Sequence, residues 1–385
     1  MARIRVEDVA EAGVVGAGGA GFPTHVKLAG RADTVLINAA ECEPLLHKDK
    51  EVLRDYADEV LDGLRNAMDL VGAKQGRIGI KEKYHDVINL LQGKVSTGIE
   101  VAPLRDAYPA GDEFILVYDV LGRVIPPGGI PLAVGAVVMN VETAMNVSLA
   151  GQQPVTDKFL SVAGAVAEPI TLRVPLGVTL AQCVAAAGGP TIPDPHYIVG
   201  GVMMGRLEDN HEALVEKTTG GVIVLPGDHV VVRRRRQDWQ QIARIGRSAC
   251  DQCRDCTDLC PRTLLGHALK PHEVMRSINY GLVEPTQIVT AAALCCECRL
   301  CAAYACPLGL SPLAYYRACK AELRQQGWQN TVHRRAGVQP LAELNDRRVP
   351  VSRLIDRLGL SAYAERTAAY DLAERAPAEV CVLLK

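Results

Sequence analysis

The alternation of apolar and polar positions changes character along the chain. Up to about residue 150, helix-like stretches alternate with short apolar runs, which is typical of an α/β layer structure. Over residues 49–71 the apolar positions recur at helical spacing with charges between them, so this stretch is predicted to be one helix. The short apolar runs are predicted to be strands, and they read TVLINAA (34–40), RIGI (77–80), FILVYDVLG (114–122) and AVVMNV (136–141).

From Gly151 the pattern becomes β-rich, with pieces separated by Gly and Pro, and it predicts a small sheet domain with one helix at TLAQCVAAAGG (179–189). The run Arg233–Arg236 closes this domain and is interpreted as a solvated linker face. Helical sequence follows. The predicted boundaries are a first domain over 1–150, a second over 151–236, a third over 237–345, and a tail over 346–385 whose apolar end is interpreted as the start of a further β domain.

Composition narrows the function classes. The 385 residues carry a net charge of −2, which gives no reason to expect a nucleic-acid-binding surface. The amino-terminal segment meets Glu7 and Asp8 before any apolar run and therefore lacks the core of a secretion signal. No apolar run approaches the ~18 residues that a bilayer-spanning helix needs. We therefore expect a cytoplasmic protein without a direct membrane span.

Cysteine usage points to metal. Nine of the thirteen cysteines lie between Cys250 and Cys306, and without an export signal such a cluster favours metal ligation over disulfides. The same motif occurs twice. In each copy, two residues separate successive members of a group of three cysteines, and a fourth cysteine is followed by proline. The first motif consists of Cys250, Cys253, Cys256 and Cys260, and the second of Cys295, Cys298, Cys301 and Cys306.

In such motifs three thiolates converge on one 4Fe–4S cluster, whereas the fourth cysteine binds the other cluster. We therefore predict a first cysteine set of Cys250, Cys253, Cys256 and Cys306, and a second cysteine set of Cys260, Cys295, Cys298 and Cys301. The alternative is structural zinc, which needs only two such pairs and could also recruit His267 or His272. Cys296 is out of phase and is interpreted as a spare thiol. Four cysteines are interpreted as small buried hydrophobes, namely Cys42, Cys183, Cys319 and Cys381.

The stretch GAGGAGFPT (16–24) fits the G-x-G-x-x-G pattern of a dinucleotide-binding turn, and Glu41 follows twenty positions after its last glycine. Pro23 argues against the ordinary fingerprint, because it would remove a hydrogen bond from the helix that should begin there. A loop of bare backbone amides followed by Lys27 is still suited to holding a phosphate. The alternative is a purely structural glycine turn.

Several segments, in order, carry a family resemblance. GAGGAGFPTHVKL (16–28) resembles the flavin mononucleotide (FMN) loop of the NADH-oxidising subunit of respiratory complex I. INAAECEP (37–44), YPAGDEFILVYDVLG (108–122) and MNVETAMNV (139–147) resemble later stretches of the same subunit. The resemblance implies an α/β flavin-binding domain that uses FMN and takes NADH as electron donor.

Other segments are still more similar to the RnfC group of electron-transport subunits, namely residues 122–131 and 217–226. Residues 158–232 resemble the soluble-ligand-binding β-grasp (SLBB-like) domain that these proteins share. Within the group, the four-residue spacer before Cys306 is most similar to the PduS-type cobalamin reductases of propanediol-utilisation microcompartments. The implied third part is an α-helical ferredoxin-like domain with two 4Fe–4S clusters.

The resemblance also implies roles for single residues. The flavin would be approached by Gly16, Gly18, Gly19 and Gly21, with Lys27 near its phosphate. Its ring and ribityl side would be lined by Asn38, Glu41 and Glu43, and the pocket would be completed by Gly111, Asp112, Glu113 and Asn140. Phe22 would stack on nicotinamide. Ala17 and Ala40 replace an arginine and an aspartate of the family, and the aromatic clamp for adenine is missing. We therefore expect flavin binding rather than tight NADH binding.

These cofactors predict an oxidoreductase that converts the two electrons of a hydride into single electrons. By resemblance, the acceptor would be a corrinoid or a corrinoid-binding protein, the location a bacterial microcompartment, and a shell protein a further partner. One alternative is an RnfC-like subunit of a membrane electron-transport complex. The other is a non-enzymatic iron–sulfur electron carrier.

Overall fold

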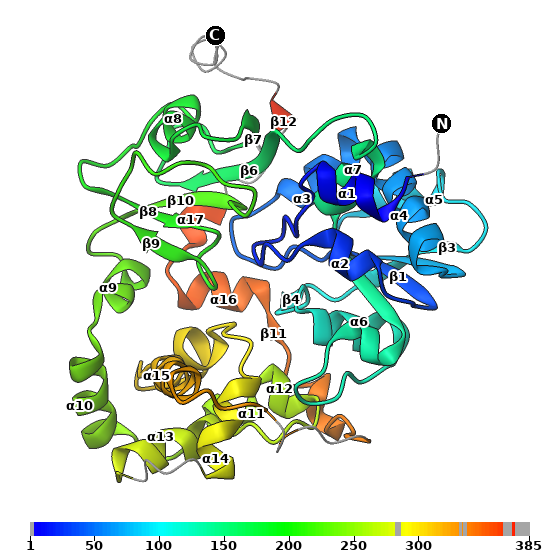
Figure 1. Ribbon diagram of the computed structural model, residues 1–385. Coiled ribbons are helices and arrows are strands. Elements are labelled where there is room, and N and C mark those ends of the chain that lie inside the picture. The colour runs from blue at the N-terminus through cyan, green and yellow to red at the C-terminus, as the bar shows by residue number, and fades with distance from the viewer. Residues whose placement is uncertain (1–3, 282–285, 331–332, 334–336, 365–371, 374–385) are drawn as a thin grey trace.

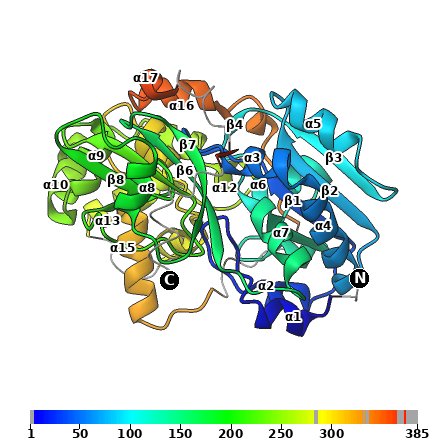
Figure 2. The same ribbon diagram turned by 90° about the horizontal axis from the view of Figure 1, so that it is seen from above.

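The computed structural model describes residues 4–281, 286–330, 333, 337–364 and 372–373. Two sheet-containing parts lie side by side above a helical part that carries the cysteine motifs (Figure 1). The view from above places α16 and α17 at the opposite edge of the molecule from α1 and α2 (Figure 2). Among the described residues, no helix has the length and apolar character to span a bilayer.

The first part is built on a four-stranded parallel sheet in the order β3-β2-β1-β5. Its strands are β1 (Thr34–Ala39), β2 (Gln75–Lys81), β3 (Ile99–Leu104) and β5 (Ala136–Asn140). The strand register pairs Asn38 with Asn140 at the carboxyl ends of the two neighbouring strands. In open parallel sheets ligands bind at this edge, so both asparagines lie where a site is expected.

Helices cover both faces of this sheet, as parallel sheets require. They are α1 (Val6–Glu11), α2 (Thr24–Leu28), α3 (Lys48–Asp55), α4 (Ala57–Val71), α5 (His85–Gln92), α6 (Glu113–Leu121), η1 (Pro131–Val134) and α7 (Val141–Leu149). Helices α4 and α7 are packed so closely that a Cβ added to Gly63 would lie 1.8 Å from the carbonyl oxygen of Ala144. Only glycine fits at this crossing.

Two predictions for the first part are wrong. The helix predicted over 49–71 is divided at Tyr56, whose backbone leaves the helical region with φ −124° and ψ 31°. Its ring packs edge-on against Phe159 at 5.5 Å, and its hydroxyl accepts a hydrogen bond from Arg173 at 3.3 Å. The apolar run 114–122, predicted to be a strand, is helix α6, because Asp112 caps its start and Gly122 ends it with φ 66°.

The second part is a six-stranded mixed sheet in the order β12-β7-β6-β10-β8-β9. Its strands are β6 (Asp157–Gly164), β7 (Ile170–Pro175), β8 (Pro195–Val199), β9 (Arg206–Glu208), β10 (Gly221–Pro226) and β12 (Leu372–Ala373). The predicted helix near 179–189 is confirmed as α8 (Leu180–Ala186), because Thr179 and Gln182 form a capping box at its start.

The arginine run forms the predicted solvated face only in part, because Arg233 and Arg236 are exposed whereas Arg234 and Arg235 are half-buried. It ends helix α9 (Val230–Arg236), and its two middle side chains turn inward. Arg235 donates to the carbonyl oxygens of Val202 and Val231, whereas Arg234 donates to those of Ala302 and Ala303. A half-buried guanidinium needs such acceptors, and the hydrogen bonds of Arg234 join the second part to the helical part.

The third part is helical. It contains α10 (Trp239–Ala249), α11 (Asp255–Asp258), α12 (Pro261–Leu264), α13 (Pro271–Asn279), α14 (Gln287–Thr290), η2 (Ala291–Leu294), η3 (Cys301–Ala305), α15 (Pro312–Gln325) and η4 (Ala342–Leu344). Beyond it, β11 (Val349–Pro350) pairs with β4 (Ala107–Tyr108), and α16 (Val351–Arg357) and α17 (Ser361–Ala364) follow. The segment 349–364 thus returns to the sheet parts, with α16 lying above the helical part (Figure 1).

One hydrophobic core joins all of these parts. It contains Leu36 and Tyr108 of the first part, Ile198 of the second, Cys298 of the third and Leu354 of α16. A shared core of this kind fixes the relative positions of the parts, because side chains in it are close-packed.

Candidate functional site

The glycine loop, residues 16–22, is closed by its own backbone between α1 and α2. The N–H of Gly16 donates to the carbonyl of Phe22 at 2.9 Å, and the N–H of Gly21 donates to the carbonyl of Gly16 at 3.1 Å. Pro23 lies at the N-cap of α2, so no helical hydrogen bond is lost there. The loop therefore differs from the ordinary dinucleotide turn, as Pro23 predicted.

The loop is anchored at one end and open along its tip. The N–H of Ala17 donates to Oγ1 of Thr143 at 2.9 Å, and its carbonyl accepts from Nζ of Lys158 at 3.0 Å. Residues 18–20 are exposed, and within the described chain their backbone N–H groups donate to no protein acceptor. A Cβ added to Gly19, which has φ +113°, would meet no atom within 4 Å. A row of free N–H donors beside open space fits a phosphate.

Three predicted site residues meet beside this loop. Nζ of Lys27 lies 3.1 Å from Oε1 of Glu113, and it also donates to the carbonyl of Val138 at 2.8 Å. The same ammonium lies 6.0 Å from the ring centroid of Phe22, whose side chain is exposed. The loop, strand β5 and helix α6 are thus connected through Lys27.

Asn38 orients the backbone of the neighbouring segment. Its Nδ2 donates to the carbonyl of Gly111 at 2.8 Å, and its Oδ1 accepts from the N–H of Ala40 at 3.2 Å. A Cβ added to Gly111 would lie 3.4 Å from Sγ of Cys42. Asn38 and Gly111 are therefore brought together as predicted, with the amide acting on protein groups.

Asn140 and Glu41 are connected through one aspartate. Nδ2 of Asn140 donates to Oδ2 of Asp49 at 2.8 Å, and the N–H of Asp49 donates to Oε2 of Glu41 at 3.0 Å. Burial, with Asp49 next in effect, raises the pKa of Glu41 to about 8. A Cβ added to Gly18 would lie 3.5 Å from Cβ of Asn140, so this group lies directly against the glycine loop.

A network of buried charges that the sequence analysis missed supports the loop from below. Lys48, Asp49, Glu142 and Lys158 are each no more than 5% exposed. Nζ of Lys48 lies 2.6 Å from Oδ1 of Asp49, and Nζ of Lys158 lies 2.5 Å from Oε2 of Glu142. Burial lowers the pKa of Lys158 to about 8 even with Glu142 beside it. Two cations and two anions balance, which is the condition for burying charges.

Two of the predicted pocket carboxylates bind other parts of the chain instead. Glu43 accepts from the backbone N–H groups of Met203 and Met204, both at 2.7 Å, and burial raises its pKa to about 7. Asp112 forms a bidentate pair with the guanidinium of Arg262 at 2.5 and 2.9 Å. These side chains hold the second and third parts against the first.

A loop of the second part also reaches the glycine loop, which sequence reasoning did not foresee. Nζ of Lys217 donates to the carbonyl of Gly13 at 2.6 Å. A Cβ added to Gly21 would lie 3.0 Å from Cγ2 of Thr218. The motif containing both residues was noted for its family resemblance, but nothing local in it indicates this partner.

The thiols of the first cysteine set influence one another. Burial raises the pKa of Cys256 to about 12, and the next contributions come from Cys306, Cys253 and Cys250. These three are the other members of the predicted set. The fourth cysteine of the second motif therefore lies near the first motif, as the crossed assignment requires, and the assignment itself stays a prediction.

The second cysteine set shows the complementary pattern. Burial raises the pKa of Cys301 well above its usual value, with Cys295 and Cys260 next in effect. A hydrogen bond with Cys296, together with burial, raises the pKa of the Cys298 thiol well above its usual value. The neighbouring thiols of Cys260 and Cys301 raise it further. Cys296 thus contacts a predicted ligand. Cys381 lies outside the described residues.

In the described ranges, no three or more His, Cys, Asp or Glu side chains are placed together as ligands of a metal ion. In a 4Fe–4S cluster each thiolate binds its own iron, so the four cysteines surround the cluster and do not converge on one point.

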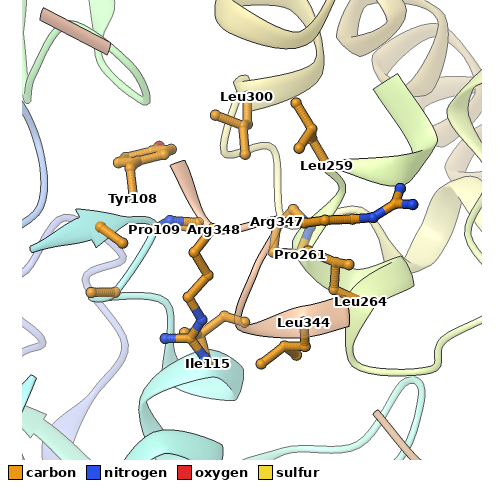
Figure 3. A pocket seen from close by; sticks show the side chains of 12 residues that line it. Tyr108, Pro109, Ile115, Leu259, Pro261, Leu264, Leu300, Leu344, Arg347 and Arg348 are labelled. Atoms are coloured by element: carbon orange, nitrogen blue, oxygen red, sulfur yellow. The ribbon is translucent and has the colours of Figure 1, made fainter. Parts of the chain in front are cut away.

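A small hollow lies apart from the glycine loop, where residues 107–115, 259–264 and 344–348 meet (Figure 3). Apolar side chains, including those of Tyr108, Leu264 and Leu344, line most of it, and its volume of about 20 Å³ is near that of one water molecule. None of the predicted site residues lines this hollow.

Three family descriptions match consecutive regions of the chain. Residues 9–149 match the Nuo51 FMN-binding domain, residues 159–207 the SLBB domain and residues 249–311 the 4Fe-4S dicluster domain. The predicted fold class and the predicted cofactors FMN and two 4Fe–4S clusters are thereby confirmed, and NADH as the electron donor stays a prediction.

Solved structures share the fold. The NAD⁺-reducing [NiFe]-hydrogenase in the H2-reduced state is 24% identical with a TM-score of 0.51, covering 85% of this chain and 63% of the hydrogenase chain. The structure of its air-oxidised state is 23% identical with a TM-score of 0.53, covering 96% of this chain and 67% of the hydrogenase chain.

Curated relatives extend the likeness to sequence. An RnfC-like subunit of the Na⁺-translocating ferredoxin:NAD⁺ oxidoreductase complex of Acetobacterium woodii is 34% identical over 262 residues, 66% of this chain and 56% of that protein. Cobalamin reductase PduS of Citrobacter freundii is 46% identical over 359 residues, and that of Salmonella typhimurium is 45% identical over 358, each covering 92% of this chain and 78% of the relative. A likeness that includes the glycine loop, the SLBB-like sheet and both cysteine motifs shows that this chain belongs to the PduS family of flavin and iron–sulfur oxidoreductases.

Proposed function

We propose that this chain takes electrons from NADH and delivers them singly to a corrinoid, whose cobalt changes oxidation state one unit at a time. The observation that carries the proposal is the 46% identity to a cobalamin reductase over 92% of the chain. The RnfC-like relative covers a smaller share, 66% of the chain, which favours the corrinoid as acceptor.

The residues at the glycine loop would bind the donor side. When bound, FMN accepts a hydride and returns its two electrons one at a time. The free N–H groups of residues 18–20 would hold its phosphate, and Asn38 would fix the backbone of Gly111 against the isoalloxazine. Exposed Phe22 would offer its face to nicotinamide.

The polar groups beside the loop would shape the charge of the site. Lys27 is paired with Glu113, so its cation stays in place at the mouth of the loop. Beneath the loop, Lys158 is held by Glu142 and directs its ammonium at the carbonyl of Ala17. Neither pair has to transfer a proton, because hydride transfer requires only that donor and acceptor are positioned and water is excluded.

For the acceptor side, we propose a corrinoid or a corrinoid-binding protein as electron acceptor and a bacterial microcompartment as location, with a shell protein as a further partner. These assignments rest on the name of the relatives and the pathway that it implies. An RnfC-like role in a membrane complex would instead require a ferredoxin as redox partner.

Anaerobic stopped-flow spectroscopy of the protein reconstituted with FMN, iron and sulfide tests the proposal. Mixing with NADH should bleach the flavin band, and added cob(III)alamin should then yield the cob(II)alamin band. The control is the same protein treated to remove flavin. Bleaching with ferredoxin reduction but no cobalamin reduction would move the assignment to the RnfC-like role, and absence of flavin binding would leave the electron carrier.

A further inference from the structure

The two cysteine sets have different surroundings, and the second set lies against the first part of the chain. The carbonyl of Cys298 accepts a hydrogen bond from the hydroxyl of Tyr108 at 2.7 Å, and both residues are buried in the shared core. Two residues after Cys260, Arg262 forms its bidentate pair with Asp112. Two separate contacts therefore fasten this set to the first part.

These contacts end beside the predicted flavin residues. Asp112 lies between Gly111, which Asn38 holds, and Glu113, which pairs with Lys27 of the loop region. A third contact comes from Arg299, whose Nε donates to the carbonyl of Met203 at 2.7 Å.

The contact of Arg299 with Met203 also connects the second cysteine set to a predicted flavin residue, because the N–H of Met203 donates to Glu43. Asp112 and Glu43 stand in the two segments that follow β4 and β1, and both were predicted to border the flavin. The second cysteine set is thus the set in the helical part that lies against the segments predicted to border the flavin.

The first cysteine set faces the other way. Cys253 is exposed, and Cys250 and Cys306 pack near Met275 and Tyr315 within the helical part. In the part of the chain that the structure describes, no hydrogen bond joins residues 4–150 to a member of this set.

We infer that electrons enter the helical part at the second cysteine set and leave it from the first, on the side where Cys253 is exposed. The inference rests on the proposed function, since it requires a flavin at the glycine loop. Its physical basis is that electron transfer between bound cofactors slows steeply with distance, so the set fastened to the flavin side is reduced first.

The electrons balance along this route. NADH and one proton supply two electrons and two protons to the flavin and leave NAD⁺. Reoxidation releases the two protons and passes the electrons one at a time, each lowering the charge of one cluster by one. Two single-electron acceptors, such as two cob(III)alamin molecules, take them from the first set.

Two matched ligand variants of the reconstituted holoprotein, Cys253→Ser and Cys295→Ser, test the order by electron paramagnetic resonance, with NADH or dithionite as reductant. In Cys253→Ser, NADH should reduce the cluster of the second set as completely as dithionite does. In Cys295→Ser, NADH should reduce the cluster of the first set at least about tenfold more slowly than in the wild type, although dithionite still reduces it.

The opposite pattern, or equal reduction by NADH in both variants, would overturn the order. Should either variant lose both clusters, rapid freeze-quenching of the wild type decides: the signal of the second set must appear first after mixing with NADH, and the reverse sequence refutes the inference. Flavin bleaching is recorded in every sample. Failure to bleach speaks against the proposed function, whereas bleaching with the wrong order speaks only against the relay.

Discussion

Replacing Asp112 by Asn should loosen the contact between the first and third parts of the chain. Asp112 binds Arg262 in bidentate geometry, and Arg262 is only 5% exposed. The same carboxylate caps α6 by accepting from the N–H groups of Phe114 and Ile115. Because Asn caps helices about as well as Asp, Asp112→Asn removes the charge pair and keeps the cap.

The expected loss of interface stability depends on the charge of Arg262, which stays buried after the substitution. Removing one partner of a buried pair costs about 3–5 kcal/mol, because the other charge remains buried and uncompensated. The guanidinium of Arg262 still stacks on the Phe114 ring, with its central carbon 3.8 Å from the ring centroid, and this cation–π contact offsets part of the cost. We therefore expect the lower end, about 3 kcal/mol, or roughly a hundredfold more opening of the interface.

Native-state hydrogen exchange measures this opening in peptides that cover α6 and α12, since a chain of several domains does not unfold in one step. The double variant Asp112→Asn with Arg262→Met should exchange more slowly than Asp112→Asn alone, because no buried charge is left unpaired. The control, Asp62→Asn, breaks an exposed pair with Arg65 and should cost less than about 0.5 kcal/mol. If Asp112→Asn changes exchange no more than this control, the argument fails.

Three other substitutions test separate features. Gly63→Ala would place a methyl 1.8 Å from the carbonyl oxygen of Ala144, so it should destabilise the protein by at least about 2 kcal/mol, and an unchanged melting temperature contradicts the helix packing. Gly19→Val should abolish FMN retention, measured as flavin per protein after gel filtration, whereas Gly177→Val, also at a positive φ in open space, should not; equal losses contradict the phosphate site. Burial raises the pKa of Glu43 from 4.5 to about 7, so its contribution to stability is complete below about pH 4.5 and lost as the pH rises through 7. Glu43→Gln should remove up to about 3 kcal/mol of that pH dependence, and identical melting curves against pH would refute it.

Local patterns in the sequence predicted elements where only local forces act. The strands at 34–40, 77–80 and 136–141 are confirmed as β1, β2 and β5, because continuous apolar runs suit a sheet buried on both faces. The run 114–122 is equally apolar, yet it is a helix. Its deciding signals, Asp112 before it and Gly122 after it, were visible in the sequence and were outweighed by the composition of the run.

Long-range pairs lie beyond such reasoning. The predicted pocket residues do gather at one sheet edge, since Lys27 meets Glu113 and Asn38 meets Gly111. No pattern along the chain indicates, however, that Asp112 binds a residue 150 positions away. A carboxylate next to a binding motif looks the same in sequence whether it faces a ligand or another domain.

The departure at Ala17 illustrates how a residue that is distant in sequence can lie beside a motif position. An arginine stands at this position in the family that the loop resembles, and its loss is one reason why we expect flavin binding rather than tight NADH binding. Ala17 is buried, and its carbonyl accepts from the ammonium of Lys158, which Glu142 holds at 2.5 Å. A cation is therefore still present beneath the loop, delivered by a strand of the second part. Because burial lowers its pKa only to about 8, this lysine remains mostly charged at neutral pH and keeps its ion pair with Glu142.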